Sequence, residues 1–467
     1  MKFIYQDNVF GLALKEIKKA IQGSKWENHV FLVGGAVRDA ILGQPLKDID
    51  LCVDMPNGGI EFAKWICNEY GCMVNDSNPC VFTKYGTAKF NLRTIHELSK
   101  VDIECVQTRK EQYHADSRNP ETVFGTISED CLRRDLTINA LYVNLSTDEV
   151  LDPCGKGIND INKHIIRTPT DANIVFEDDP LRMLRAIRFS TRYNWGITAD
   201  TWVGIVKNTY RIGIISAERI SDELSKILLC TKPSIGIIKL VDCGLMQRII
   251  PEIYQLKGIK QGVQHYGDVF EHTMSVIDNT QPIIEHRWAG LLHDIGKIKC
   301  KSIINGVIHF YGHDSVGAGM SNDILAKLKF PNKEIRAITI AVAQHMRFKN
   351  IGQSMPSLKS IRKFVMQVEG EFIPIILDVM NADNISHSKE YCNSKQVPYI
   401  IDKINEIQND KNNPPVKLPI TGTDIMNEFN LKSGPTIGIL LDKLNDFYAE
   451  NPNLTKDDYL EYLSQFI

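Results

Sequence analysis

Two aspartates with one residue between them, Asp48 and Asp50, lie in the run KDIDLCVD, residues 47–54. The Ile, Leu and Val residues around them predict a β-strand, in which residues i and i+2 point to the same face. Neighbouring carboxylates repel each other, and burying either without a partner is costly. A divalent cation is the simplest partner, because Mg²⁺ accepts carboxylate oxygens and keeps positions open for phosphate and water. Two exposed carboxylates on an edge strand are the alternative that this spacing leaves open.

A third acid strengthens the metal interpretation. The run KVDIECVQTR, residues 100–109, is also strand-like, and it carries Asp102 and Glu104 on one face. Either could complete a carboxylate triad, and periodicity does not decide between them. In a two-metal site, one ion activates an attacking hydroxyl while the other stabilises the leaving group.

A glycine turn precedes the aspartates in the run HVFLVGGAVRDAILG. A short apolar strand ends at Gly34 and Gly35, which allow a tight turn, and AVRDAIL can begin a helix. Free N–H groups at a helix N-terminus attract anions, and Arg38 adds a positive charge nearby. The same residues could also form an ordinary strand-to-helix turn without a ligand.

Three segments in fixed order carry a resemblance to a known family. They are LVGGAVRDAILG with KDIDLCV, then EDCLRRDLTINALYVN at 129–144, then EDDPLRMLRAIRFSTRY at 177–193. Together they resemble the class II tRNA nucleotidyltransferase and poly(A) polymerase family over about residues 30–195. The segment LPITGTDIMNEFNLKSGPTIGILLDKL also looks like the tail of bacterial CCA-adding enzymes. The resemblance implies a polymerase β-like mixed α/β head.

The resemblance assigns roles to individual residues. It implies that Asp48 and Asp50 bind two Mg²⁺ ions, and Glu104 matches the third acid by its distance from Arg109. Asp135 is suited to accept a hydrogen bond from a ribose hydroxyl. The residues that it implies for nucleotide binding in the head are Gly34, Gly35, Arg38, Arg133, Arg134, Asp135 and Asn139.

Asp179 and Arg182 are three residues apart, which predicts neighbours on one helix face. A surface salt bridge of little energetic value is one interpretation. The family resemblance instead implies that they read the Watson–Crick edge of CTP or ATP, because a carboxylate accepts from an exocyclic amine and a guanidinium donates to ring acceptors. Arg185 and Arg188 (with Arg192) extend a basic stripe that is either a solvated face or a track for nucleotide and RNA phosphates.

A second set of metal-binding residue types follows downstream. His272, the adjacent pair His293 and Asp294, and Asp383 occur in the order typical of the HD phosphohydrolase superfamily, which they resemble. Imidazole and carboxylate ligands suit a transition metal or Mg²⁺. His313, Asp314 and His345 lie where that superfamily often has further ligands. The resemblance implies a metal-bound water able to attack a phosphate ester.

The chain must supply the elements that position these groups. Residues 1–150 alternate apolar bursts with Gly, Asn and Asp turns, whereas the later runs have helical periodicity. The N-terminal run predicts an amphipathic helix. We expect an α+β protein with a nucleotidyltransferase head at 1–150, a helical neck at 151–255, an HD domain at 256–407, and a linker with a helical tail at 408–467.

Composition limits the class of protein. The net charge of -3 gives no global basic excess, so a nucleic-acid partner needs a local basic stripe. Eleven cysteines without a CxxC pair predict reduced thiols in a cytoplasmic protein. No apolar run approaches the length of a membrane span, so no membrane partner is expected.

The motifs together favour template-independent addition of CCA to the 3′ end of tRNA. CTP and ATP would be the substrates, pyrophosphate would leave, and the tRNA 3′ end and acceptor region would be bound. Poly(A) polymerase, and enzymes that add only CC or only A, share the head motifs and stay open. Their selecting differences are expected in a flexible loop near SNPCVFTKYGTAKF, residues 77–90. Oligomeric state is not predicted.

Overall fold

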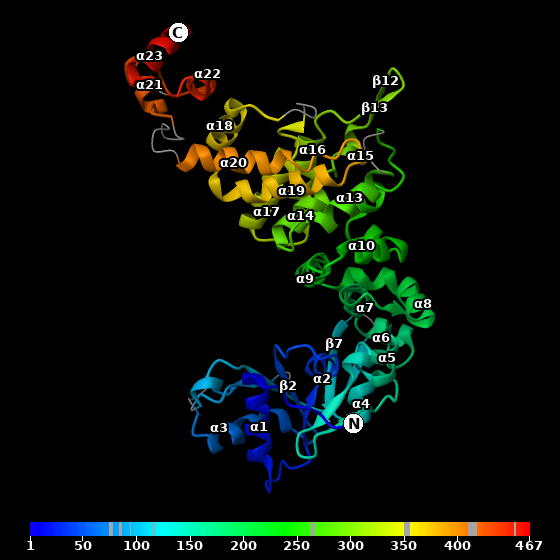
Figure 1. The fold of residues 1–467 in the computed structure, drawn as a ribbon. Coiled ribbons are helices and arrows are strands. Elements are labelled where there is room, and N and C mark those ends of the chain that lie inside the picture. The colour runs from blue at the N-terminus through cyan, green and yellow to red at the C-terminus, as the bar shows by residue number, and fades with distance from the viewer. Residues whose placement is uncertain are drawn as a thin grey trace. The chain divides into compact units, whose positions relative to one another are not determined.

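The computed structural model describes residues 1–73, 78–83, 86–93, 95–114, 117–262, 267–349, 355–409, 418–452 and 454–467. Contacts divide the chain into two compact units (Figure 1). The first comprises Met1–Ile227 with Ile235–Ile249, and the second comprises Leu228–Ser234 with Ile250–Ile467.

A seven-stranded mixed sheet forms the base of the first unit, in the order β3-β4-β5-β2-β1-β8-β9. Its strands are β1 (Val30–Val33), β2 (Ile49–Val53), β3 (Cys80–Phe82), β4 (Thr87–Phe90), β5 (Ile103–Gln107), β8 (Tyr142–Asn144) and β9 (Glu149–Leu151). Among the described strands of this sheet, β2 and β5 alone pair in parallel, so their connection needs a crossover, which includes α3 (Gly58–Glu69). Gly59 lets α3 approach β5, since a Cβ there would stand 2.8 Å from the Val106 backbone.

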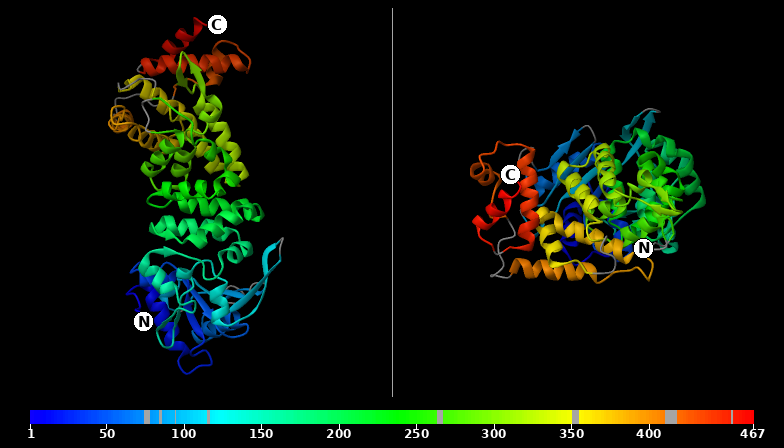
Figure 2. Two further views of the ribbon diagram at one scale, coloured as in Figure 1. Left: turned by 90° about the vertical axis from the view of Figure 1, so that its right-hand side faces the viewer. Right: turned by 90° about the horizontal axis from the view of Figure 1, so that it is seen from above.

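Short helices and a hairpin flank this sheet. The helices are α1 (Val9–Ile21), α2 (Gly35–Ile41), η3 (His96–Leu98), α4 (Ile127–Leu132) and η4 (Thr137–Asn139). The hairpin of β6 (Arg109–His114) and β7 (Ser117–Phe124) extends away from the sheet (Figure 2). The predicted N-terminal amphipathic helix is confirmed, because α1 buries Ala13, Leu14, Ile17 and Ile21 along one face.

Helices continue the first unit after the sheet. They are α5 (Gly157–Lys163), α6 (Ala172–Asp178), α7 (Leu181–Tyr193), α8 (Ala199–Asn208), η5 (Thr209–Ile214), α9 (Ala217–Leu228), α10 (Pro233–Asp242) and α11 (Leu245–Ile249). A short parallel pair, β10 (Ile165–Ile166) and β11 (Gly196–Ile197), brings the chain before α6 beside the end of α7. Nine residues of α7 are buried, so this helix is a structural centre of the region.

The second unit is almost wholly helical. It contains α12 (Pro251–Gln255), α13 (Val269–Asn279), α14 (Ile284–Leu292), α15 (Lys297–Cys300), the hairpin β12 (Ser302–Ile304) and β13 (Val307–His309), α16 (His313–Lys327), α17 (Asn332–Gln344), α18 (Leu358–Gln367), η7 (Gly370–Phe372), α19 (Ile373–Ile385) and α20 (Gln396–Asn409). Helices α13, α14, α17 and α19 pack on one another and bury Trp288, Ile338 and Val379. The second set of metal-binding residue types lies on α13, α16 and α19 and just past the ends of α14 and α17.

Three C-terminal helices pack around a hydrophobic cluster of their own. They are α21 (Gly422–Glu428), α22 (Pro435–Glu450) and α23 (Lys456–Ser464), and Leu444 and Tyr459 are fully buried between them. Ion pairs from α18 to Asp446 and Glu450 of α22 join this cluster to the preceding helices. Residues 410–417, most of the predicted linker, lie outside the described residues.

The expected α+β fold class, a mixed head followed by helices, is confirmed. The division into four named domains stays a prediction. None of the eleven cysteines forms a disulfide. No helix in the described part of the chain is long and apolar enough to cross a membrane.

A carboxylate site and a histidine–aspartate cluster

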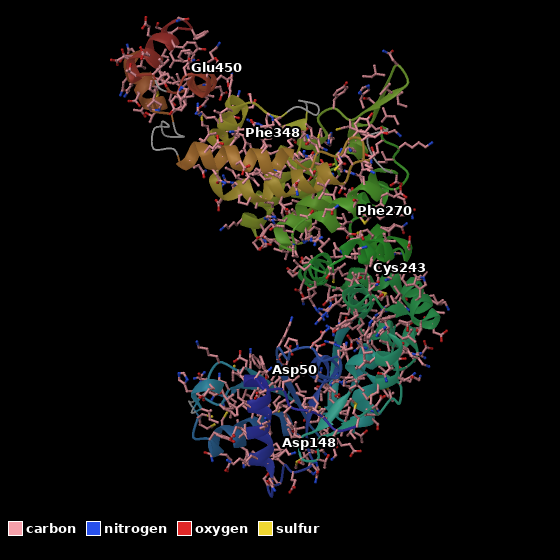
Figure 3. All side chains as sticks on the ribbon, viewed as in Figure 1. Asp50, Asp148, Cys243, Phe270, Phe348 and Glu450 are labelled. Atoms are coloured by element: carbon pink, nitrogen blue, oxygen red, sulfur yellow. The ribbon has the colours of Figure 1, made fainter. Side chains whose placement is uncertain are left out.

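Asp50 on β2 lies opposite Glu104 on β5 in the parallel register, so both side chains point to one face of the sheet. Figure 3 marks the position of Asp50. Asp48 comes one residue before β2 and is exposed. Asp102 lies before β5 and forms an ion pair with Lys89 at 3.0 Å. The acid beside Asp50 is therefore Glu104, and Asp102 is engaged elsewhere.

Burial, together with the nearby carboxylates of Asp48 and Glu104, raises the pKa of Asp50 to about 6, although Arg134 opposes the shift. Such a group carries uncompensated negative charge at neutral pH. The ligand oxygens of these three acids do not lie within 4.8 Å of one another, as those of the second unit do. Mutually repelling carboxylate oxygens on one face are a donor set that Mg²⁺ fits, because the cation supplies the missing positive charge.

The glycine turn leads from β1 into α2. Gly34 has a φ of 70°, which favours glycine, and a Cβ there would stand 3.3 Å from Nη1 of Arg134. Arg38 is buried and donates to Asp39 at 2.8 Å and to the side chain of Asn139. Its guanidinium also lies 4.8 Å from the ring centre of Phe189. Arg38 is thus engaged inside the protein, whereas Arg134 borders the glycine turn.

A buried aspartate that the sequence analysis missed holds Arg133 and Arg134. Asp130 lies within α4, and its carboxylate oxygens are 2.7 Å from Nη2 of Arg133 and 3.0 Å from Nη2 of Arg134. Tyr142 also donates to Asp130. Burial raises the pKa of Asp130, but the two arginines outweigh burial and hold that pKa well below its usual range. The spacing of an acid three and four residues before two arginines in a helix was the available signal.

Asp135 connects this region to α7. It accepts from Asn139 at 3.1 Å and from Arg185 Nε at 2.7 Å. Burial opposes ionisation, but Arg185 and Asn139 outweigh it and lower the pKa of Asp135 to about 2. An ionised, buried carboxylate is a strong hydrogen-bond acceptor, which a ribose hydroxyl could use.

The prediction that Asp179 and Arg182 share a helix face is wrong. Helix α6 ends at Asp178 and α7 begins at Leu181, because Pro180 disfavours helical geometry at the residue before it. Asp179 accepts from the Leu181 amide at 3.1 Å and lies 3.5 Å from Nη2 of Arg219. Arg182 is buried and donates to the Val175 carbonyl at 3.3 Å.

The arginines of α7 already have acidic neighbours. Arg185 pairs with Asp135, the Nε of Arg188 lies 3.0 Å from Glu223, and Arg192 lies 3.8 Å from Asp39. Glu223 is buried on α9. The expected stripe therefore faces protein carboxylates rather than open solvent.

The described part of the predicted selection loop at 77–90 forms β3 and β4, an antiparallel hairpin. Ser77, Lys84 and Tyr85 lie outside the described residues.

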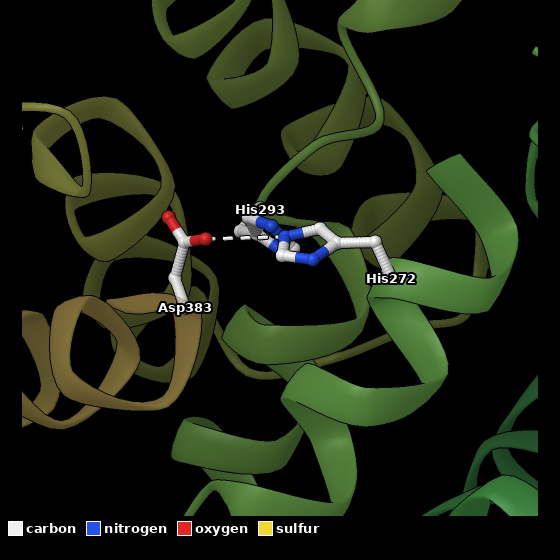
Figure 4. A group of neighbouring side chains, drawn as sticks. All are labelled: His272, His293 and Asp383. Atoms are coloured by element: carbon white, nitrogen blue, oxygen red, sulfur yellow. Dashed lines mark hydrogen bonds and ion pairs between the residues drawn. The ribbon is translucent and has the colours of Figure 1, made fainter. Parts of the chain in front are cut away.

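Six histidine and aspartate side chains converge in the second unit. They form two groups with ligand atoms within 4.8 Å of one another, namely His272 with His293 and Asp383, and Asp294 with His313 and His345. Figure 4 shows the first group, in which His272 Nε2 lies 3.1 Å from Asp383 Oδ1. In the second group, His313 Nε2 lies 3.3 Å from Asp294 Oδ1. The four predicted ligands, His272, His293, Asp294 and Asp383, thus all lie in the two groups. Of the three further candidates, His313 and His345 belong to the second group and Asp314 belongs to neither.

Backbone carbonyls orient three of these imidazoles. The Nδ1 atoms of His293, His313 and His345 bond to the carbonyls of Gly290, Phe310 and Val342 at 2.8, 2.7 and 2.6 Å. Their Nε2 atoms are buried without a hydrogen-bond partner within the described chain. Burial lowers the pKa of His345 to about 3, which keeps that ring neutral. Buried Nε2 atoms turned toward carboxylates fit a divalent metal ion.

Two lysines also reach the cluster, and sequence reasoning missed both. Lys297 Nζ lies 2.7 Å from Asp294 Oδ2, and Lys349 pairs with Asp383. Burial opposes ionisation of the aspartates, but His293 with Lys297 at Asp294, and Lys349 with His272 at Asp383, hold their pKa values well below the usual range. Lys297 follows Asp294 by three residues, which was a usable signal, whereas Lys349 reaches Asp383 only through tertiary packing.

Three family models match this chain. They are the Poly A polymerase head domain at 30–167, the probable RNA and SrmB-binding site of polymerase A at 196–256, and the HD domain at 269–387. The first covers the carboxylate site, and the third covers the histidine–aspartate cluster.

Proteins of similar sequence are described as CCA proteins or CCA tRNA nucleotidyltransferases. The Multifunctional CCA protein of Aromatoleum aromaticum is 31% identical over 325 residues, which are 68% of this chain and 74% of that protein. The mitochondrial CCA tRNA nucleotidyltransferase of Candida glabrata is 35% identical over 240 residues, 47% of this chain and 43% of that protein. The chain therefore matches less than half of the length of this yeast relative.

Solved structures share the fold along nearly the whole chain. The Bacillus stearothermophilus CCA-adding enzyme in complex with CTP has a TM-score of 0.66 at 20% identity and covers 97% of both chains. The Thermotoga maritima CCA-adding enzyme complexed with tRNA has a TM-score of 0.61 at 19% identity, covering 99% of this chain and 96% of that one. At this identity the likeness concerns the fold.

Proposed function

The chain belongs to the family of CCA-adding tRNA nucleotidyltransferases with an HD domain, and on that premise we propose that it adds C, C and A to the 3′ end of tRNA. CTP and ATP are the nucleotide donors, and pyrophosphate is released at each addition. The descriptions of relatives as CCA proteins, and of similar folds holding CTP or tRNA, support this proposal.

The observation that carries the proposal is the pairing of Asp50 with Glu104 on one face of the sheet. Asp48, Asp50 and Glu104 would hold two Mg²⁺ ions, and such ions would lower the pKa of the RNA 3′ hydroxyl and neutralise charge on the phosphates. The protein groups around them position the nucleotide. The amides of the turn at Gly34 and Gly35, with Arg133 and Arg134, face the triphosphate.

Base selection falls to Asp179 and Arg182, with Arg219 orienting the aspartate. A carboxylate accepts from the exocyclic amine of cytosine or adenine, while a guanidinium donates to ring acceptors. Guanine and uracil present an acceptor to the carboxylate and are rejected. Asp135, held ionised by Arg185 and Asn139, accepts from the ribose.

The expected domain division at 1–150, 151–255, 256–407 and 408–467 remains part of the proposal. The HD domain carries a second activity, hydrolysis of phosphate esters with a divalent metal held by His272, His293, Asp294 and Asp383. The carbonyl-anchored imidazoles, whose buried Nε2 atoms lack a hydrogen-bond partner among the described residues, support metal binding there.

One assay tests the main activity. Purified protein, Mg²⁺ and tRNA ending at the discriminator base are incubated with each nucleotide and with mixtures, and product lengths are measured at single-nucleotide resolution. Three additions that need CTP and ATP and then stop are expected. A long ladder from ATP would indicate a poly(A) polymerase, and two additions from CTP alone would indicate a CC-adding enzyme. The absence of any addition would overturn the proposal.

A further inference from the structure

A basic and aromatic segment joins the two halves of the histidine–aspartate cluster. Between Asp294 and Asp314 the chain has Lys297, Lys299 and Lys301 and no acidic residue. This segment forms α15 and the hairpin of β12 and β13. Lys299 and Lys301 are exposed, and neither has an ion pair within the described residues. Lysines without an ion pair in a segment that also carries aromatic residues are typical of nucleic-acid and nucleotide contacts.

The hairpin ends in an exposed aromatic stack. Its turn is formed by Asn305 and Gly306, whose positive φ angles of 51° and 80° suit a two-residue hairpin loop. After β13, the rings of His309 and Tyr311 stack with centres 5.0 Å apart and planes 9° from parallel. Tyr311 is 71% exposed, so the stack is accessible from solvent.

The stack leads directly into the cluster. Phe310, between the two stacked residues, accepts from Nδ1 of His313 at 2.7 Å, and its ring centre lies 5.3 Å from Nζ of Lys297. Lys297 in turn pairs with Asp294. Two peptide units separate Tyr311 from His313, so their Cα atoms are at most about 7.6 Å apart. The backbone of Tyr311 thus lies close to that of a residue of the cluster.

We propose that Tyr311, stacked on His309, is a platform for the nucleobase of a nucleoside phosphate ester whose phosphate enters the histidine–aspartate cluster. The inference deepens the proposed hydrolytic activity of the HD domain by naming a residue that contacts the base of its substrate, and it rests on that activity. Lys299 and Lys301 attract the phosphates of such a ligand. Because every base has a π-face, the platform tolerates different bases. The shared chemistry, a base joined to a phosphate ester, occurs in a free nucleotide and at an RNA 3′ end.

The test compares two substrates on the full chain loaded with Mn²⁺, Ni²⁺, Co²⁺ or Mg²⁺. One is a nucleoside 2′,3′-cyclic phosphate, and the other is methyl riboside 2′,3′-cyclic phosphate, which lacks a base. Tyr311→Ala is expected to raise KM for the nucleotide about tenfold and to leave KM for the base-free ester unchanged. Tyr311→Phe keeps the ring and should behave as the parent. Tyr254→Ala, at a 40% exposed tyrosine on α12, is the matched control.

Equal effects of Tyr311→Ala on both substrates, or an effect on neither, would overturn the platform. An oligoribonucleotide ending in a 2′,3′-cyclic phosphate forms a second arm, and a KM below that of the mononucleotide would identify RNA ends as the source. If the parent hydrolyses neither substrate with any metal, the proposed hydrolytic activity fails. Equilibrium dialysis of 3′-AMP against the parent and Tyr311→Ala then still decides the platform, since about tenfold weaker binding by the variant supports it and equal binding refutes it.

Discussion

Asp50 on β2 and Glu104 on β5 stand opposite each other in the only parallel strand pair of the seven-stranded sheet. This register places two acids from segments more than fifty residues apart on one face, next to the glycine turn. Asp102, the other acid of the same run, is turned into an ion pair with Lys89. The structure therefore identifies Glu104, rather than Asp102, as the acid beside Asp50, a choice that the alternation of the sequence left open.

Replacement of Asp50 or Glu104 should slow nucleotide addition, whereas replacement of Asp102 should not. Glu104→Gln and Asp50→Asn are each expected to lower the rate of nucleotide addition by about a hundredfold or more, because each removes charge stabilisation where the phosphates react. Asp102→Asn is the matched control and should retain nearly full activity. Single-turnover addition of CTP to tRNA measures the effect. Loss of activity in Asp102→Asn with a normal Glu104→Gln would reverse the assignment.

The raised pKa of Asp50 predicts a pH-dependent metal affinity. With a pKa of about 6, Asp50 binds a proton more tightly in the folded state than in the unfolded chain. A metal ion must displace that proton at low pH, so the apparent Mg²⁺ affinity should fall as the pH drops through 6. Mg²⁺ titrations of nucleotide addition between pH 5 and 8 measure this, and an affinity independent of pH would contradict it.

The same raised pKa lowers the stability of the folded protein at high pH, whereas it weakens metal binding at low pH. A carboxyl with a raised folded-state pKa favours folding while protonated, and this advantage is lost as the pH rises toward 6. Without metal, Asp50→Asn should therefore increase the free energy of unfolding by about 2–3 kcal/mol at pH 7.5 and by little near pH 4. Urea unfolding at both pH values measures the difference. If Asp50→Asn has the same free energy of unfolding as the parent at pH 7.5, then the surroundings of Asp50 do not disfavour its ionised form.

The Asp135–Arg185 ion pair should act as a unit in nucleotide binding. Arg185→Met leaves a buried carboxylate that still accepts from Asn139 and from the backbone N–H of Leu136 but has lost its paired cation, and KM for both CTP and ATP is expected to rise by about tenfold or more. In a double-mutant cycle with Asp135→Asn, the coupling energy should be about 1–3 kcal/mol. Asp135→Asn should also reduce the preference for CTP over 2′-deoxy-CTP. Additive effects of the two substitutions would argue against a shared role.

The histidine–aspartate cluster predicts the number of bound ions. With ligands for two sites, the histidine–aspartate cluster should hold up to two divalent ions, and His345→Gln should remove one by depriving the second group of a neutral imidazole. Elemental analysis after dialysis measures this. His309→Gln, which lies outside both groups, should keep the parent content. An unchanged content in His345→Gln would show that His345 is not needed to hold an ion.

Sequence patterns predicted the structural features that depend on residues close together in the chain. The alternation around Asp50 and the turn at Gly34 determine their own local geometry, and the order of the motifs carried the fold class. Pro180 was a readable signal for the break between α6 and α7, but the three-residue spacing of Asp179 and Arg182 was given more weight. That error shows that a proline outweighs helical spacing across it.

Partners distant in the sequence could not be predicted. Arg38 reaches Asn139 across 101 positions, and Arg185 reaches Asp135 across 50. Lys349 meets Asp383 only because α17 and α19 pack together. Each of these contacts depends on how helices and strands dock, which the periodicity of a single segment does not contain. For that reason the sequence predicted phosphate-binding roles for Arg38 and Arg188, whereas in the structure both arginines contact other groups of the protein.

Arg219 on α9 provides the sharpest test of base selection. Its guanidinium lies 3.5 Å from Asp179, in a part of the chain that no motif indicated, and in the proposed function it orients the carboxylate. Arg219→Ala is expected to leave the carboxylate in place but less constrained, so that kcat/KM for CTP falls about tenfold while incorporation of UTP becomes measurable. Arg219→Lys restores a cation and should recover part of the selectivity. Arg211→Ala, an arginine of the same region on η5, is the control. If Arg219→Ala lowers the use of CTP and leaves UTP excluded as in the parent, Arg219 supports the fold alone, and selection depends on Asp179 without its help.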